Sequence, residues 1–146
     1  MTPSSQEMES PEIPGRFKGT FDDIWCVFDK DDHARLQQAL KQAKDNNFQV
    51  AFSNPCFELW YLLHFQDQAA YLTTHDAVSA LRTHILHYKK GRAGLYAVLR
   101  ENQPKAMKRA LKLRQNHISG GAAWGKHENP STSVDRLVRF LNGLAT

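Results

Sequence analysis

The residues best suited to chemistry are two aspartates, Asp29 and Asp31, that directly follow an apolar run. The run from Ile24 to Phe28 is rich in β-branched and aromatic residues, which predicts a strand buried on both faces, as in a parallel sheet. Ligands of open α/β sheets bind beyond the carboxyl ends of the strands. Carboxylates two positions apart leave an extended chain on the same side, and hard oxygen donors suit Mg²⁺. The spacing therefore predicts a magnesium site, but it also allows a solvated turn in which Asp31 or Asp32 caps the next helix.

A third candidate group is Glu58, which lies in the stretch SNPCFELWYLLHF from Ser53 to Phe65. Asn54 is placed to cap a helix and Pro55 to occupy its first position, so the helix is expected to begin directly after a strand. Apolar residues on almost every face predict that this helix lies in the core. Glu58 then falls in the first turn, where the helix dipole alone would favour a carboxylate. The functional alternative is that Glu58 faces the same crevice as the two aspartates.

Positive charge is concentrated in the C-terminal half of the chain. Residues 1–60 carry six Lys/Arg against ten Asp/Glu (net −4), whereas residues 61–146 carry thirteen against five (net +8). Basic residues recur three and four positions apart along a predicted helix that begins at Gln103, so they share one face. A solvated surface explains such a stripe, but its density also favours contact with a phosphate backbone. The candidate nucleic-acid contacts are Lys89, Lys90, Arg92, Lys105, Lys108, Arg109 and Lys112.

The elements that must position these groups form a strand, helix, strand unit. The pattern predicts strands over 23–28 and 48–53 with a helix over 34–46 between them, followed by a helical C-terminal half. Residues 1–20 are rich in Pro, Ser and Glu and are predicted to be disordered, which leaves residues 21–146 as one domain. Thr132 and Asp135 are spaced as a capping box for the last helix. The predicted fold class is α/β, with a small parallel sheet.

Composition excludes several classes of protein. No apolar run approaches the roughly 18 residues of a membrane span, and the N-terminus lacks the features of a signal peptide. Two cysteines, Cys26 and Cys56, are too few for a disulfide framework and are expected to be reduced. The sequence contains no Walker loop, GxSxG or zinc-type spacing. We therefore expect a cytoplasmic protein without a membrane partner.

Three stretches of this sequence resemble the RloB-like family. They are DIWCVFDKDDH, SNPCFELWYLLHF and NPSTSVDRLVRFL, in this order, and the resemblance runs from about Asp22 to Leu141. It implies a bacterial protein linked to restriction–modification or abortive-infection systems and to an ATPase partner. It also implies a Toprim-like fold, which primases, topoisomerases and OLD-type nucleases share. The expected function is that of a Mg²⁺-dependent nuclease subunit in phage defence.

The resemblance assigns roles to individual positions. It implies that Asp29 and Asp31 bind the metal ion and that Glu58 lines the catalytic site. A divalent ion would stabilise charge on the attacked phosphodiester while a carboxylate transfers protons.

One part of the family pattern is missing from this sequence. In Toprim nucleases the proton-transferring glutamate lies on an earlier strand, and no apolar strand of that kind precedes Asp22 here. We therefore expect a truncated sheet with an exposed edge, which invites association with a partner or a second copy. The alternative function is a catalytically inactive module that binds nucleic acid or an ATPase partner.

Overall fold

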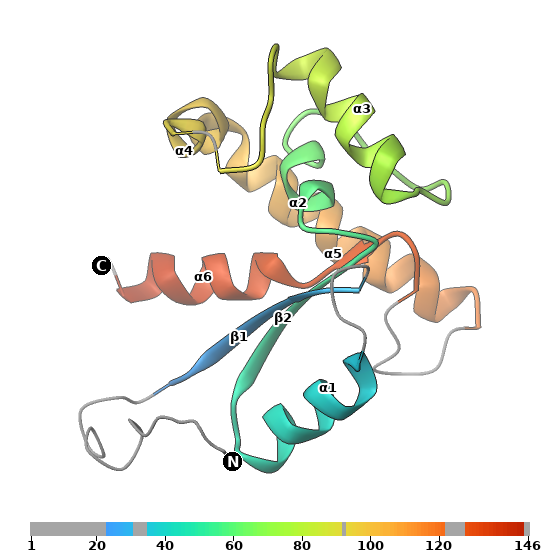
Figure 1. Ribbon diagram of the computed structural model, residues 1–146, viewed down its shortest axis with the longest axis vertical. Coiled ribbons are helices and arrows are strands. Elements are labelled where there is room, and N and C mark those ends of the chain that lie inside the picture. Colours follow the sequence, from blue (N-terminus) through green and yellow to red (C-terminus); the bar gives the residue numbers. More distant parts are fainter. Residues whose placement is uncertain (1–22, 31–34, 92, 122–127, 145–146) are drawn as a thin grey trace.

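The computed structural model describes residues 23–30, 35–91, 93–121 and 128–144. In these ranges it contains helices on both sides of a small sheet, so the α/β prediction is confirmed (Figure 1). The predicted disordered segment 1–20, the second aspartate of the pair, Asp31, and the basic residue Arg92 lie outside the described residues.

Among the described residues the sheet has three strands, in the order β1-β2-β3, and is mixed. Strand β1 (Trp25–Asp29) runs parallel to β2 (Gln49–Asn54), and helix α1 (Leu36–Asp45) connects them. The register places Asp29 opposite Ser53, so both strands end at the same edge. Strand β3 (Ser131–Thr132) pairs antiparallel with the last two residues of β2. The predicted strand, helix, strand unit is confirmed, whereas β3 is too short to leave a periodic pattern.

The prediction that β1 is buried on both faces is wrong. Val27 is 49% exposed and Ile24, just before the strand, is 38% exposed, whereas Ala51 to Asn54 in β2 are all buried. Helices α1 and α6 (Val134–Leu144) both contact β2 and lie on opposite sides of the sheet (Figure 1). In the described part of the chain β1 is an edge strand. The apolar run therefore predicted the strand correctly, but not the burial of its two faces.

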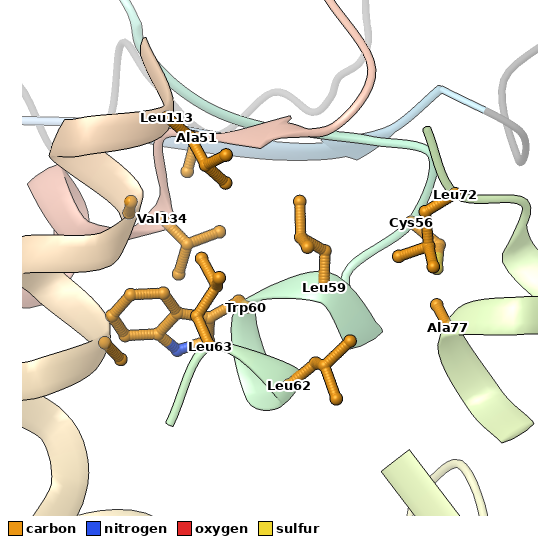
Figure 2. Close-up of a cluster of buried hydrophobic side chains, with 12 residues drawn as sticks. Ala51, Cys56, Leu59, Trp60, Leu62, Leu63, Leu72, Ala77, Leu113 and Val134 are labelled. Atoms are coloured by element: carbon orange, nitrogen blue, oxygen red, sulfur yellow. The ribbon is translucent and has the colours of Figure 1, made fainter. Parts of the chain in front are cut away.

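The largest apolar cluster surrounds helix α2 (Glu58–Leu62) (Figure 2). Leu59 and Leu62 are fully buried, and Trp60 is only 5% exposed, so the predicted core helix is confirmed. Its predicted start is wrong, because Phe57 and not Asn54 is the N-cap. Asn54 is the last residue of β2 and pairs with Ser131 of β3, so its backbone is part of the sheet and does not begin the helix.

The remaining helices complete the C-terminal half. Helix α3 spans Thr74–His84, and its N-cap is Thr73, whose side chain accepts a hydrogen bond from the Asp76 backbone N–H. Helix α4 (Leu95–Leu99), the 3-10 helix η2 (Arg100–Asn102) and helix α5 (Gln103–Ser119) follow one another directly. None of the helices within the described ranges has the length and apolar composition that a membrane crossing requires.

Candidate nucleic-acid and metal site

Hydrogen bonds between buried polar groups fix the carboxyl-end edge of the sheet. The hydroxyl oxygens of Ser53 and Thr132 share a hydrogen bond of 2.8 Å across β2 and β3. The Ser133 backbone N–H donates to the Phe52 carbonyl, and the Phe52 N–H donates to the Ser133 hydroxyl. On the other side of β2, the Lys30 N–H donates to the Ser53 carbonyl at 3.0 Å. These hydrogen bonds hold the backbone next to Asp29 in a defined position.

Asp29, the first aspartate of the predicted magnesium site, lies at this edge. It is the last residue of β1 and is partly buried, at the strand end where ligands of α/β sheets bind. Mg²⁺ takes one or two carboxylates and keeps several waters, so a carboxylate at this place fits its chemistry. No cluster of three His, Cys, Asp or Glu side chains occurs among the residues that the structure describes. Because Asp31 lies outside them, the two-aspartate site stays a prediction.

Glu58 is the first residue of α2, and its side chain lies in the core against the segment that follows α3. The residue is 3% exposed, and its Oε2 accepts a 2.7 Å hydrogen bond from the Tyr88 hydroxyl. Its Oε1 is buried without a hydrogen-bond partner in the described part of the chain. Burial, and then the Glu58 charge, raise the pKa of the neighbouring Cys56 thiol to about 12. Burial and the hydrogen bond to Glu58 likewise raise the pKa of Tyr88, so both neighbours stay protonated at neutral pH.

We expect Tyr88→Phe to lower the free energy of unfolding by about 1–3 kcal/mol, because it leaves a buried carboxylate oxygen without its donor. Urea denaturation of both proteins measures the difference. Tyr96→Phe is the matched control, since Tyr96 is 65% exposed and should stay within about 0.5 kcal/mol of wild type. Equal stabilities for the two variants would contradict a structural role for the Glu58–Tyr88 hydrogen bond.

Four of the predicted nucleic-acid contacts come together on α5. Lys105, Lys108, Arg109 and Lys112 line a cavity of about 310 Å³, and Asp67 is its other lining residue. Arg109 Nη1 donates a 2.7 Å hydrogen bond to the Leu63 carbonyl, and its Nε lies 3.7 Å from Asp67 Oδ1. The arginine therefore anchors α5 to the end of α2, while the lysines stay exposed.

Two other predicted contacts, Lys89 and Lys90, lie apart from α5. Lys89 and Lys90 are exposed on the segment between α3 and α4, and they do not line this cavity. The structure thus groups the basic side chains of α5 on one surface, which we call the α5 groove. The segment with Lys89 and Lys90, which we call the basic turn, is not part of this groove.

An ion pair that sequence reasoning missed holds the α5 groove to the sheet. Arg114 donates to both carboxylate oxygens of Asp135, at 2.5 and 2.9 Å, and also to the Thr132 carbonyl at 2.6 Å. Asp135 is 1% exposed, and its carboxylate binds Arg114, whereas the sequence had suggested it as a member of a capping box. The cap for the Val134 N–H is the Thr132 hydroxyl. The ion-pair partners are 21 positions apart, and no local pattern connects them.

Comparison with known proteins supports one assignment. Residues 9–141 match the family model described as RloB-like protein. The match contains all three stretches that carry the resemblance, and it begins closer to the N-terminus than Asp22. No curated protein and no solved structure gives a significant match. Because the family model covers nearly the whole sequence, the chain belongs to the RloB-like family.

Proposed function

We propose that this RloB-like protein binds nucleic acid through the α5 groove and hydrolyses phosphodiesters with Mg²⁺ held by Asp29 and Asp31. The observation that carries the proposal is the grouping of four basic side chains against a single acidic one in the groove lining. Such a concentration of cations favours a polyanion, because binding releases the counterions condensed on its phosphates. In this proposal the protein acts in a bacterial phage-defence system, as its family implies.

The spacing of the lysines suits a phosphate chain. Lys105 and Lys112 are seven residues apart, which is about 10 Å along a helix with a rise of 1.5 Å per residue. One strand of B-form DNA carries a charge about every 3.4 Å of axis, so roughly three phosphates match this length. Arg109 is held by Leu63 and Asp67, so we assign the mobile contacts to the lysines.

Three carboxylates supply the chemistry in this proposal. Mg²⁺ bound by Asp29 and Asp31 would stabilise negative charge on the attacked phosphodiester. Glu58 would assist in proton transfer, through the oxygen that accepts no hydrogen bond from any described residue.

The burial of Glu58 favours a second function. A carboxylate that is 3% exposed and bonded to Tyr88 is placed to stabilise the core, with no catalytic task required. The chain would then be an inactive subunit that binds nucleic acid or an ATPase partner. Salt-sensitive binding or co-purification of an ATPase, together with no Mg²⁺-dependent cleavage, would favour this second function.

Removing two lysines tests the binding half of the proposal. We expect Lys108→Ala/Lys112→Ala to weaken binding and to reduce the slope of log K against log salt by about 1.4–1.8, since each lost phosphate contact removes roughly 0.7–0.9. Fluorescence anisotropy at several salt concentrations measures both quantities. Lys41→Ala/Lys44→Ala is the matched control, because it removes the same charge from the exposed face of α1. Equal salt slopes for the two double variants would contradict a role for the α5 groove.

A further inference from the structure

A second cavity, of about 290 Å³, is lined by four aromatic and four aliphatic side chains, together with His64, Gln103 and Asn142. Phe57, Trp60 and Tyr61 contribute from α2 and its N-cap, and Tyr96 contributes from α4. The volume is close to the lower end of the 300–1,000 Å³ that is typical of small-ligand sites. Tyr96 is 65% exposed, so its ring is open to a second ring that could stack on it.

Polar groups lie in this wall beside the aromatic rings. His64 is 2% exposed, and its Nδ1 lies 2.9 Å from the Trp60 carbonyl oxygen. Because a carbonyl only accepts, Nδ1 carries the hydrogen and Nε2 is an acceptor. Burial and, secondarily, the Arg109 charge lower the pKa of His64, so the ring is neutral at neutral pH.

The side-chain amides at the rim add further hydrogen-bonding capacity. The Asn142 amide donates to the Gln103 side-chain oxygen at 3.2 Å. An amide oxygen accepts and an amide NH₂ donates, so the pair has an acceptor and donors left for a ligand. Both residues line the cavity. A flat ring whose edge carries both donors and acceptors fits this combination.

We propose that this cavity, which we call the aromatic pocket, receives one unpaired base of a single-stranded nucleic acid. The inference rests on the proposed function and names its substrate class. Aromatic side chains bind the faces of bases by stacking, and amide and imidazole groups bind their edges. A base inside a duplex offers neither its faces nor its pairing edge, so the pocket selects single strands.

The charge of the chain around the pocket favours a nucleotide over an apolar peptide. Between Arg82 and Arg114 there are ten Lys/Arg against one acidic residue, Glu101. The segment with Lys89 and Lys90 leads directly into α4, and α5 begins with a pocket residue and continues into the lysine stripe. Each of these two wall segments therefore adjoins exposed cations that suit the phosphates of the same strand.

The packing of Tyr88 connects the basic turn to the pocket wall. The Tyr88 ring meets the ring of the wall residue Tyr61 edge to face, with centroids 6.1 Å apart. Tyr88 is itself held by Glu58. The backbone just before Lys89 is thus fixed against the pocket.

The test compares three fluorescent probes of equal length: a single-stranded DNA, the same phosphodeoxyribose strand without bases, and the duplex. We expect the full chain to bind the strand with bases roughly 5- to 150-fold more tightly than the abasic strand, the gain that stacking of one base provides. Tyr96→Ala should remove most of this ratio and leave affinity for the abasic strand unchanged. Tyr71→Ala is the matched control, because Tyr71 is 74% exposed and does not line the pocket.

The outcomes separate this inference from the proposed function. Salt-sensitive binding with a ratio near one, or an unchanged ratio in Tyr96→Ala, would overturn the pocket while the α5 groove stands. Tighter binding of the duplex than of the single strand would also overturn it. A wild-type chain that binds none of the probes would overturn both. Circular dichroism of each variant checks that the fold is retained.

Discussion

Asp135→Ala is expected to lower the free energy of unfolding by about 3–5 kcal/mol, the usual cost of removing one partner of a buried ion pair. The Arg114 guanidinium would keep its charge, because an arginine does not deprotonate in a protein. Its side chain is 16% exposed, so water could replace little of the lost contact. The same substitution loosens the junction of α5, β3 and α6, where Arg114 also bonds the Thr132 carbonyl.

Urea denaturation of wild type and variant measures this loss. The matched control is Asp45→Ala, which breaks the Lys41–Asp45 pair, whose side chains are 75% and 56% exposed. Exposed pairs contribute about 0–1 kcal/mol, so the control should stay near wild type. If Asp135→Ala does not fold, Asp135→Asn keeps the volume and one acceptor and should show a smaller loss. A loss below about 1 kcal/mol in Asp135→Ala would contradict the structural role of the pair.

The strand, helix, strand unit could be predicted because its evidence is local. An unbroken apolar run marks β1, a short stretch of strand-forming residues marks β2, and a helical pattern separates them. The cap of α3 is local as well, since the Thr73 side chain accepts a hydrogen bond from the Asp76 backbone N–H three positions later.

The features that could not be predicted depend on residues far apart in the sequence. Strand β3 has two residues and exists only because β2 offers it a partner. The Asn54 backbone is used by that pairing, so α2 begins later than its helix signals predicted. Asp135 had local evidence for a cap, but its carboxylate binds a partly buried arginine from another helix.

The candidate site also combines features that local sequence patterns predict with features that depend on residues far apart in the chain. Spacing alone predicted the α5 stripe, because residues three and four apart on one helix share a face whatever the rest of the chain does. Glu58 remained ambiguous in the sequence, since its hydrogen-bond partner Tyr88 is 30 positions away. The aromatic pocket was not foreseen, because its wall combines residues from α2, α4, α5 and α6 that look like ordinary core positions.

Replacing both aspartates is expected to reduce Mg²⁺-dependent cleavage of nucleic acid by at least about a hundredfold. The metal ion would supply several kcal/mol of charge stabilisation, and each 1.36 kcal/mol is a factor of ten in rate. Asp29→Asn/Asp31→Asn removes the charge with little change in side-chain size. Binding at the α5 groove should persist, because the substitution removes no cation from it.

Asp23→Asn is the control for the change of charge, since Asp23 is exposed and lies before β1. It should cleave at the wild-type rate. Folding of all three proteins is checked by circular dichroism, and binding by anisotropy. A loss of cleavage that accompanies a loss of binding would point to misfolding and not to the metal site.

The rate of cleavage of single-stranded DNA and RNA, with Mg²⁺ and with EDTA, is the most direct measurement of the central proposal. We predict cleavage by the wild-type chain with Mg²⁺, none with EDTA, and at least a hundredfold loss in Asp29→Asn/Asp31→Asn with binding retained. Cleavage by that variant at the wild-type rate, or wild-type cleavage that EDTA leaves unchanged, would contradict it.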